Sequence, residues 1–192
     1  TVPSPIFLRL APDLPADYRA LLERVRYQGA LCLVLELRHQ LTPYYWLNVS
    51  DRTMPFVAVV EHTNLYGPEH YQGRHIVYLS NYLAREHLLL RLPADDLLAL
   101  FRPYLRRLNP AFTDEWLHSY HLFRDPGAQP IVTREYGAHI PPHATPIEGL
   151  YLANTTQIYP EDRGTNYSIR QGRRVARMVA DELTRELILA PR

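Results

Sequence analysis

The residues best suited to bind a ligand lie near the end of the chain, in a segment whose apolar spacing predicts a helix. This helix is expected from about Thr165 to Leu187, directly after Gly164. Arg170, Arg173, Arg174 and Arg177 crowd its first half. The amino end of a helix carries a partial positive charge and free backbone N–H groups, so it can hold an anion or an electron-rich carbonyl. The alternative is a solvated arginine face that binds nothing.

A second group of candidates carries aromatic and imidazole side chains. An apolar substrate pocket could be lined by His62, Asn64, Tyr66, Tyr78 and Tyr82. His62 could act there as an acid or base. Aromatic pairs packed across neighbouring strands account for the same tyrosines without any ligand, and this interpretation is favoured. No catalytic residue is identified from the sequence.

Several other chemistries are excluded. All 21 basic residues are arginine, so neither a Schiff-base lysine nor a Walker-type phosphate loop can exist. The single cysteine, Cys32, lies in an apolar run and is expected to be a core residue. His118 and His121 would point to opposite faces of a strand, and His139 with His143 lacks a nearby acidic ligand, so no metal site is expected.

Composition describes an ordinary globular chain. With 192 residues, 46% of them hydrophobic, it can form one substantial core and a small second unit. A net charge of +1 argues against a nucleic-acid partner. No apolar run approaches the roughly 20 residues of a membrane span and no secretory signal is present, so a cytoplasmic or membrane-peripheral location is expected.

The elements that would position these residues follow from hydrophobic periodicity. Helices are expected over 14–26 and 93–108, the second interrupted at Pro103, and strands over 30–37, 44–49, 56–60, 75–83 and 116–123. The proline-rich stretch 126–146 is expected to be an irregular connector.

The final segment differs from the rest. Residues 148–153 resemble a strand buried in a parallel sheet, yet no parallel neighbour is found for it. The predicted fold is α+β. A first domain over 1–145 is built on a mainly antiparallel sheet with flanking helices, and a strand–loop–helix over 146–192 belongs to an incomplete second domain.

Two stretches carry a family resemblance. Gly149-Leu-Tyr-Leu-Ala-Asn154 and Gly164-Thr-Asn-Tyr-Ser-Ile-Arg-Gln-Gly-Arg-Arg-Val-Ala176 resemble the C-terminal FAD segment of the flavin-containing amine oxidase superfamily. This superfamily includes protoporphyrinogen oxidases, phytoene desaturases and amine oxidases. Upstream, Tyr78-Leu-Ser-Asn-Tyr-Leu83 is similar to the substrate domain of the protoporphyrinogen-oxidase-like branch. This similarity implies that the first domain, over 1–145, is a substrate-binding domain.

The resemblance assigns residues to the cofactor. Backbone N–H groups of Asn166, Tyr167, Ser168 and Ile169 would lie near the pyrimidine carbonyl of the flavin. Asn154 would lie near the ribityl and pyrophosphate groups, where the family usually has an acidic residue. Arg163, next to Gly164, is the best polar candidate in the preceding loop. Tyr167 and Ser168 depart from the family pattern, which usually has small residues at these positions.

None of the eight glycines forms the Gly-x-Gly-x-x-Gly pattern that dinucleotide binding requires. The chain is therefore expected to be an inactive fragment that does not hold FAD alone and needs a missing N-terminal Rossmann domain. As a full-length protein it would oxidise a C–N or C–C bond of an apolar or amine substrate by hydride transfer to FAD. The alternatives are a non-redox FAD mutase similar to UDP-galactopyranose mutase, or a non-catalytic α+β binding module. A homodimer formed by exchange of the terminal strand and helix is also possible.

Overall fold

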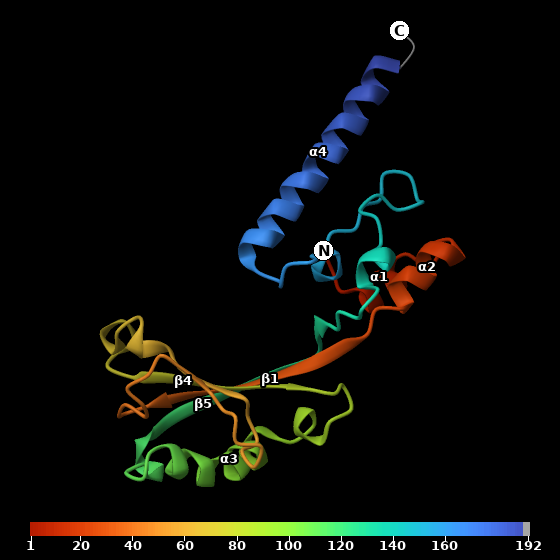
Figure 1. The fold of residues 1–192 in the computed structure, drawn as a ribbon. Helices are drawn as coiled ribbons and strands as arrows, with labels where there is room; N and C mark the ends of the chain where they lie inside the picture. The colour runs from red at the N-terminus through yellow and green to blue at the C-terminus, as the bar shows by residue number, and fades with distance from the viewer. Residues whose placement is uncertain (190–192) are drawn as a thin grey trace. The chain divides into compact units, whose positions relative to one another are not determined.

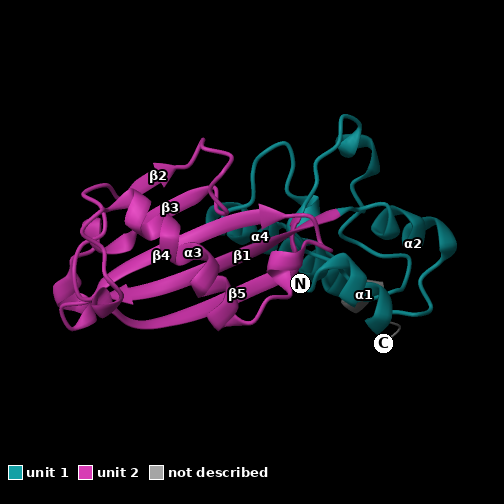
Figure 2. Cartoon of the chain, turned by 90° about the horizontal axis from the view of Figure 1, so that it is seen from below, with its two compact units in different colours: residues 1–26, 130–192 teal, residues 27–129 magenta. Residues whose placement is uncertain are grey.

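The computed structural model describes residues 1–189, with side chains described up to residue 185. The chain divides into two compact units, which Figure 2 shows in different colours. Unit 1 comprises Thr1–Arg26 and Pro130–Arg192, and unit 2 comprises Tyr27–Gln129. The predicted division after residue 145 concerns the domains of a complete enzyme and stays a prediction.

Unit 2 is built on a five-stranded sheet in the order β2-β3-β4-β1-β5. Its strands are β1 (Tyr27–Leu37), β2 (Trp46–Asn48), β3 (Ala58–Glu61), β4 (His75–Leu83) and β5 (Leu117–Pro130). β4 pairs antiparallel with both β1 and β3, with Leu33 and Val59 opposite Leu79. The predicted α+β fold with an antiparallel sheet is confirmed.

One face of this sheet forms the main core. Side chains alternate along β1 between buried and half-buried, so Leu31, Leu33, Leu35 and Leu37 share the covered face. Helix α3 (Ala94–Leu108), drawn in green in Figure 1, contributes Leu97, Leu98, Phe101 and Leu105 to the same core. Pro103 does not split α3, which runs as one helix through it.

β5 is longer than the sequence predicts, because it continues through Pro126 to Pro130. A proline removes one backbone donor, which a central strand cannot tolerate but an edge strand can. β5 occupies an edge of the sheet, so the prolines leave the strand intact.

Unit 1 has a smaller core. Helices α1 (Ser4–Leu10) and α2 (Ala16–Glu23) meet around Phe7, Leu14, Tyr18 and Leu22, together with Leu152. The Tyr18 hydroxyl donates to the Pro142 carbonyl at 2.7 Å, and burial raises the pKa of Tyr18 to about 12. The helix predicted over 14–26 forms as the shorter α2, and α1 was not predicted from the sequence.

The strand predicted over 148–153 is wrong. This segment forms only an isolated antiparallel bridge between Ala144 and Tyr151. Leu152 N donates to His143 O at 2.8 Å, so the segment folds back on the preceding connector. Gly149, with φ of +71°, provides the turn. Within this segment, Leu152 is fully buried in the core of unit 1.

The last helix, α4 (Thr165–Leu189), forms as predicted, but its expected buried stripe is exposed. Ile169 and Leu183 are 52% and 54% exposed, and a Cβ added at Gly172 would meet nothing within 4 Å. Val179 is the half-buried member of the stripe, and it lines a shallow hollow together with Gly149 and Tyr151. The predicted stripe also includes Leu187, whose side chain lies outside the described residues. Within the described chain, none of the helices has the length and hydropathy that crossing a membrane requires.

Candidate cofactor and substrate sites

The start of α4 presents backbone donors that the helix itself does not use. Its first bond of the i to i−4 type is donated by Ser168 N to Gly164 O at 2.9 Å, so earlier N–H groups have no intrahelical acceptor. Asn166 and Ser168 are exposed, Tyr167 is half-buried, and the first turn holds no acidic residue. A helix start of this kind fits an electron-rich carbonyl or an anion.

The loop before α4 is fastened to the helix by an ion pair that the sequence did not reveal. Arg170 Nη2 donates to Glu161 Oε1 at 2.7 Å, and its guanidinium lies 4.9 Å from the centre of the Tyr167 ring. The same contact lowers the pKa of the Glu161 carboxyl. Arg163 lies in this loop and is half-buried. Arg170 therefore shapes the helix start, and its own charge is partly neutralised.

Asn154 lies in the same unit but directs its side chain into the protein. Its Oδ1 accepts from Thr156 N at 3.0 Å and from Thr156 Oγ1 at 2.5 Å. Its Nδ2 donates to Val2 O at 3.0 Å and to Ser4 Oγ at 3.4 Å. All hydrogen-bonding positions of this buried amide are occupied, so Asn154 fixes the local backbone. Its direct contact with a cofactor stays a prediction.

Three predicted substrate residues come together in unit 2. His62 Nε2 is hydrogen-bonded to Tyr71 Oη at 2.8 Å, and its ring lies 6.0 Å from that of Tyr78. Tyr66 stacks on His70 at 3.9 Å between ring centres. Tyr71 and His70 were missed, because a 3₁₀ turn over Pro68–Tyr71 brings them back onto the predicted residues.

Tyr82 belongs to the same sheet face as Tyr78. It follows Tyr78 by four residues on β4, so both side chains point to one face, and it is 47% exposed. Between them stands Ser80, opposite Cys32 on β1. Burial raises the pKa of the Cys32 thiol, in agreement with its interpretation as a packed residue.

Asn64 is engaged elsewhere, in a polar network with Gln40, Thr42 and Tyr44. Its Nδ2 donates to Thr42 O at 2.7 Å and to Tyr44 O at 3.0 Å, and its Oδ1 accepts from Gln40 Nε2 at 2.6 Å. Asn64 thereby fixes the connection between β1 and β2. A contact with substrate stays a prediction for this residue.

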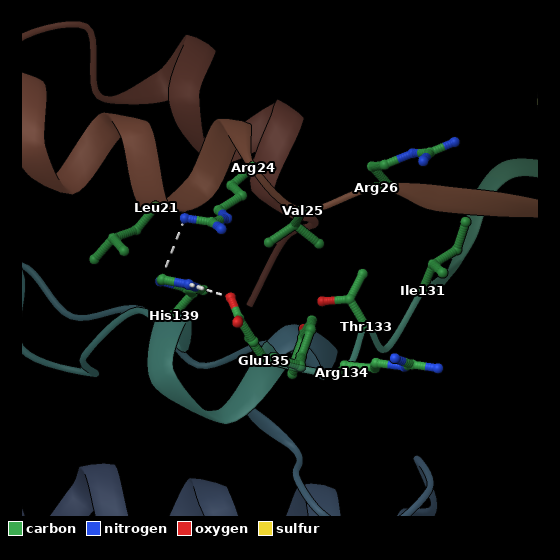
Figure 3. A pocket seen from close by; sticks show the side chains of 10 residues that line it. Leu21, Arg24, Val25, Arg26, Ile131, Thr133, Arg134, Glu135 and His139 are labelled. Carbon is green, nitrogen blue, oxygen red and sulfur yellow. Dashed lines mark hydrogen bonds and ion pairs between the residues drawn. The ribbon is translucent and has the colours of Figure 1, made fainter.

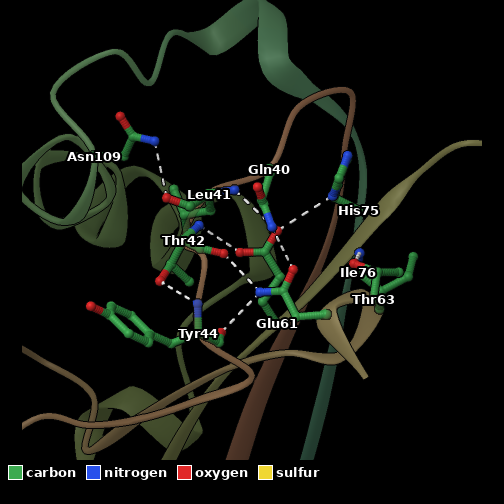
Figure 4. A network of polar contacts seen from close by, with 10 residues as sticks. Gln40, Leu41, Thr42, Tyr44, Glu61, Thr63, His75, Ile76 and Asn109 are labelled. Carbon is green, nitrogen blue, oxygen red and sulfur yellow. Dashed lines mark hydrogen bonds and ion pairs between the residues drawn. The ribbon is translucent and has the colours of Figure 1, made fainter. Parts of the chain in front are cut away.

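Glu61 anchors the same connection from inside the protein (Figure 4). Its fully buried carboxyl accepts from Leu41 N at 3.1 Å and from Thr42 N at 2.6 Å. Burial outweighs these bonds and raises the pKa of Glu61 to about 7. His75 Nδ1 lies 3.5 Å from Oε1, and burial lowers the pKa of His75. Nothing in the sequence pattern signalled this pair, which depends on strand pairing and loop closure.

The histidines considered as metal ligands do not form a ligand set. His121 Nε2 lies 3.4 Å from Glu36 Oε1, and His143 Nδ1 lies 3.0 Å from Leu152 O. Among the described residues, no three His, Cys, Asp or Glu side chains are grouped as a metal site would require.

Comparison with known proteins identifies the family of the chain. The sequence model of the flavin containing amine oxidoreductases matches residues 1–180. The chain belongs to this family. The description of this family names a flavin as its cofactor. No curated protein matched the chain.

Three solved structures are similar to this chain, and the fold comparison rests on the first two of them. A protein provisionally named protoporphyrinogen oxidase from Exiguobacterium sp. 255-15 is 14% identical, with a TM-score of 0.59 over 73% of this chain and 31% of its own. Reduced UDP-galactopyranose mutase is 16% identical, with a TM-score of 0.50 over 64% of this chain and 26% of its own. An oxidoreductase from Methanosarcina mazei is 17% identical, with a TM-score of 0.49 over 71% of this chain and 31% of its own. The chain thus spans about a third or less of the structures it matches.

Proposed function

We propose that the chain contributes one side of the flavin site and part of the substrate wall of an FAD-dependent oxidoreductase. On the cofactor side, the proposal assigns the N–H groups of Asn166 and Tyr167, which precede the first i to i−4 bond, to the pyrimidine carbonyl. Ser168 and Ile169 complete this first turn, Arg163 and Gly164 lie beside it, and Asn154 fixes the backbone behind it. The observation that carries the proposal is the exposed, acid-free start of α4, in a chain of the flavin containing amine oxidoreductase family.

The role of this helix start is electrostatic. When bound, a flavin supplies the hydride acceptor. The N–H groups and partial positive charge of α4 favour electron-rich oxygen, and they are preorganised because the helix is already formed. The ion pair between Arg170 and Glu161 holds the preceding loop against the first turn. The chain would therefore orient the cofactor and stabilise negative charge on it.

The substrate wall is proposed on the ring cluster of unit 2. His62, Tyr66 and Tyr78 offer apolar ring surface, and the hydrogen bond between His62 and Tyr71 offers a proton carrier at its edge. Tyr82 extends this surface along β4. Such a wall suits an apolar substrate, or an amine whose cation can lie against aromatic faces.

Asn166→Asp tests the cofactor assignment, because it changes only charge and the native asparagine is its own isosteric control. A carboxylate in the first turn stabilises a helix, so thermal stability should hold or rise. FAD affinity of the polypeptide that carries this chain and a dinucleotide-binding domain should fall about tenfold or more, because the carboxylate repels electron-rich oxygen. Thermal unfolding measures the stability, and titrations followed by flavin absorbance and fluorescence measure the FAD affinity.

Two outcomes would contradict the proposal. One is unchanged FAD affinity in Asn166→Asp, and the other is a correctly folded, colourless polypeptide that FAD cannot reconstitute. Anaerobic bleaching of bound flavin by amine or apolar substrates would support oxidation. A nucleotide sugar that is isomerised without net bleaching would instead identify a mutase.

A further inference from the structure

A pocket of about 380 Å³ lies entirely within unit 1, apart from the α4 start and from the ring cluster (Figure 3). It forms between the end of α2 with the residues that follow it and the segment 131–139. Part of its lining is apolar, from Leu21, Val25 and Ile131. This volume falls in the range that holds a small organic ligand.

The pocket walls are fixed by the backbone and by a buried tyrosine. Ile131 N donates to Arg26 O at 2.8 Å, which ties the two walls together. Tyr136 is 7% exposed, and its hydroxyl donates to Thr156 O at 2.7 Å. Tyr136 N also donates to Thr133 O at 3.2 Å. The cavity therefore exists before any ligand arrives, which reduces the entropic cost of binding.

The charged part of the lining is strongly unbalanced. The lining contains three arginines, Arg24, Arg26 and Arg134, and one carboxylate, that of Glu135. That carboxylate is approached by His139, whose Nε2 lies 4.0 Å from Glu135 Oε2, while His139 Nδ1 lies 3.5 Å from Arg24 Nη1. Figure 3 shows the side chains of Arg24, His139 and Glu135 on one side of the pocket. Arg26 and Arg134 lie on the other side, on two separate segments, and both extend away from Glu135. Neither Arg26 nor Arg134 has an acidic partner among the described residues.

Uncompensated guanidinium groups beside apolar wall select for one class of ligand. Their planar donors match a carboxylate in bidentate geometry, and they repel a cation. The apolar residues favour a ligand whose charged end is attached to a hydrophobic body. An amine substrate has the wrong charge for this pocket, so its ligand is a different molecule from the substrate proposed above.

We propose that this pocket is a binding site for an organic carboxylate with an apolar body. Arg26 and Arg134 hold the carboxylate of the ligand, and Val25 and Ile131 contact its apolar body. The assignment is independent of the proposed flavin site, because every residue it uses lies in unit 1 away from the first turn of α4.

The test compares probes of one shape and opposite charge. Isothermal titration calorimetry of the purified protein with 4-phenylbutyrate at low ionic strength should give saturable binding that weakens as salt is raised. 4-Phenylbutylammonium should not bind, and inorganic phosphate should bind at least tenfold more weakly because it has no apolar body. Equal binding of the ammonium probe would overturn the charge argument. Equal binding of phosphate would overturn the requirement for an apolar body.

Variants locate the binding. Arg26→Gln with Arg134→Gln should weaken 4-phenylbutyrate binding tenfold or more, and the melting temperature should change little because both side chains are exposed. Arg19→Gln is the matched control, since Arg19 lies on α2 outside the pocket and pairs with Glu23. Undiminished binding in the double variant, or an equal loss in Arg19→Gln, refutes the site.

Discussion

The two units contain helices with similar apolar spacing and opposite environments. In unit 2, α3 places Leu97, Phe101 and Leu105 at 0% exposure against the sheet. In unit 1, α4 repeats the same kind of stripe, yet Ile169 and Leu183 stay about half exposed. Apolar periodicity therefore predicts that a helix forms, whereas burial depends on whether a surface is present to receive it.

The contrast extends to the cores. Phe101 meets Phe56 edge to face at 5.2 Å between ring centres, inside a cluster whose buried side chains come from β1, β3, β4, α3 and the connecting loops. Unit 1 buries a much smaller cluster around Leu22 and Leu152. Unit 2 should thus supply most of the chain's stability, and substitutions of comparable size should cost less in unit 1.

The largest effect is expected for Phe101→Ala in unit 2. Deleting a fully buried ring removes its transfer free energy and leaves a cavity under the sheet, so the free energy of unfolding should fall by about 3–5 kcal/mol. Denaturant titration followed by circular dichroism measures this loss. A loss below about 1 kcal/mol would show that α3 is not the main cover of the sheet.

A smaller effect is expected for Leu22→Ala in unit 1. Leu22 is 1% exposed, but the cluster around it is small and can relax, so the loss should be about 2–3 kcal/mol. Hydrogen exchange should increase mainly in unit 1. If protection in β1 and β4 fell equally, the two units would have to be treated as one cooperative core.

Glu61→Gln should reveal a pH-dependent cost inside unit 2. The pKa of Glu61 is about 7 in the folded chain and near 4.5 when unfolded, so the folded state binds the proton more tightly. Stability from this group is complete below pH 4.5 and is lost as the pH rises through 7. The stability of the native protein relative to Glu61→Gln should therefore decline by about 2 kcal/mol between pH 5 and 8.

Thermal and denaturant unfolding of both proteins across this pH range gives the difference directly. His75 Nδ1 lies 3.5 Å from Glu61 Oε1, and its lowered pKa acts in the opposite direction, so the difference reports on the two groups as a coupled pair. A difference that stays constant from pH 5 to 8 would mean that Glu61 is already ionised at pH 5.

The smallest effect is expected for Leu183→Ala on α4. The side chain is about half exposed, and alanine favours helix, so the free energy of unfolding should change by less than about 0.5 kcal/mol. The same denaturant titration measures it beside Phe101→Ala. A loss above about 2 kcal/mol would show that Leu183 is buried in solution, and the contrast between the helices would disappear.

The elements that sequence predicted well are those whose pattern is local. Alternation along β1 and the apolar spacing of α3 depend only on which face is covered. The apolar run around Leu152 led to the prediction of a strand over 148–153, which the structure does not form. A short apolar run has the same pattern in a buried parallel strand and in a loop packed on a core. Here the loop reaches the core through the turn at Gly149.

Among the site residues, those suggested by residue type were predicted, and those brought together only by the tertiary fold were missed. His62, Tyr66 and Tyr78 were named from residue type and do meet, whereas Tyr71 joins them only through a turn that the pattern did not specify. The basic pocket was invisible in the sequence because its arginines come from segments about 110 residues apart. Tertiary proximity of this kind has no signal in periodicity.

The prolines of β5 have a consequence for how the molecule behaves at high concentration. A sheet edge with unpaired N–H and C=O groups can recruit a strand from another molecule. At one edge β5 lacks backbone donors at Pro126 and Pro130, and at the other β2 is only three residues long. The β2 edge is therefore too short to recruit a strand, and the prolines interrupt the last five residues of β5, which confines pairing between copies to residues 117–125.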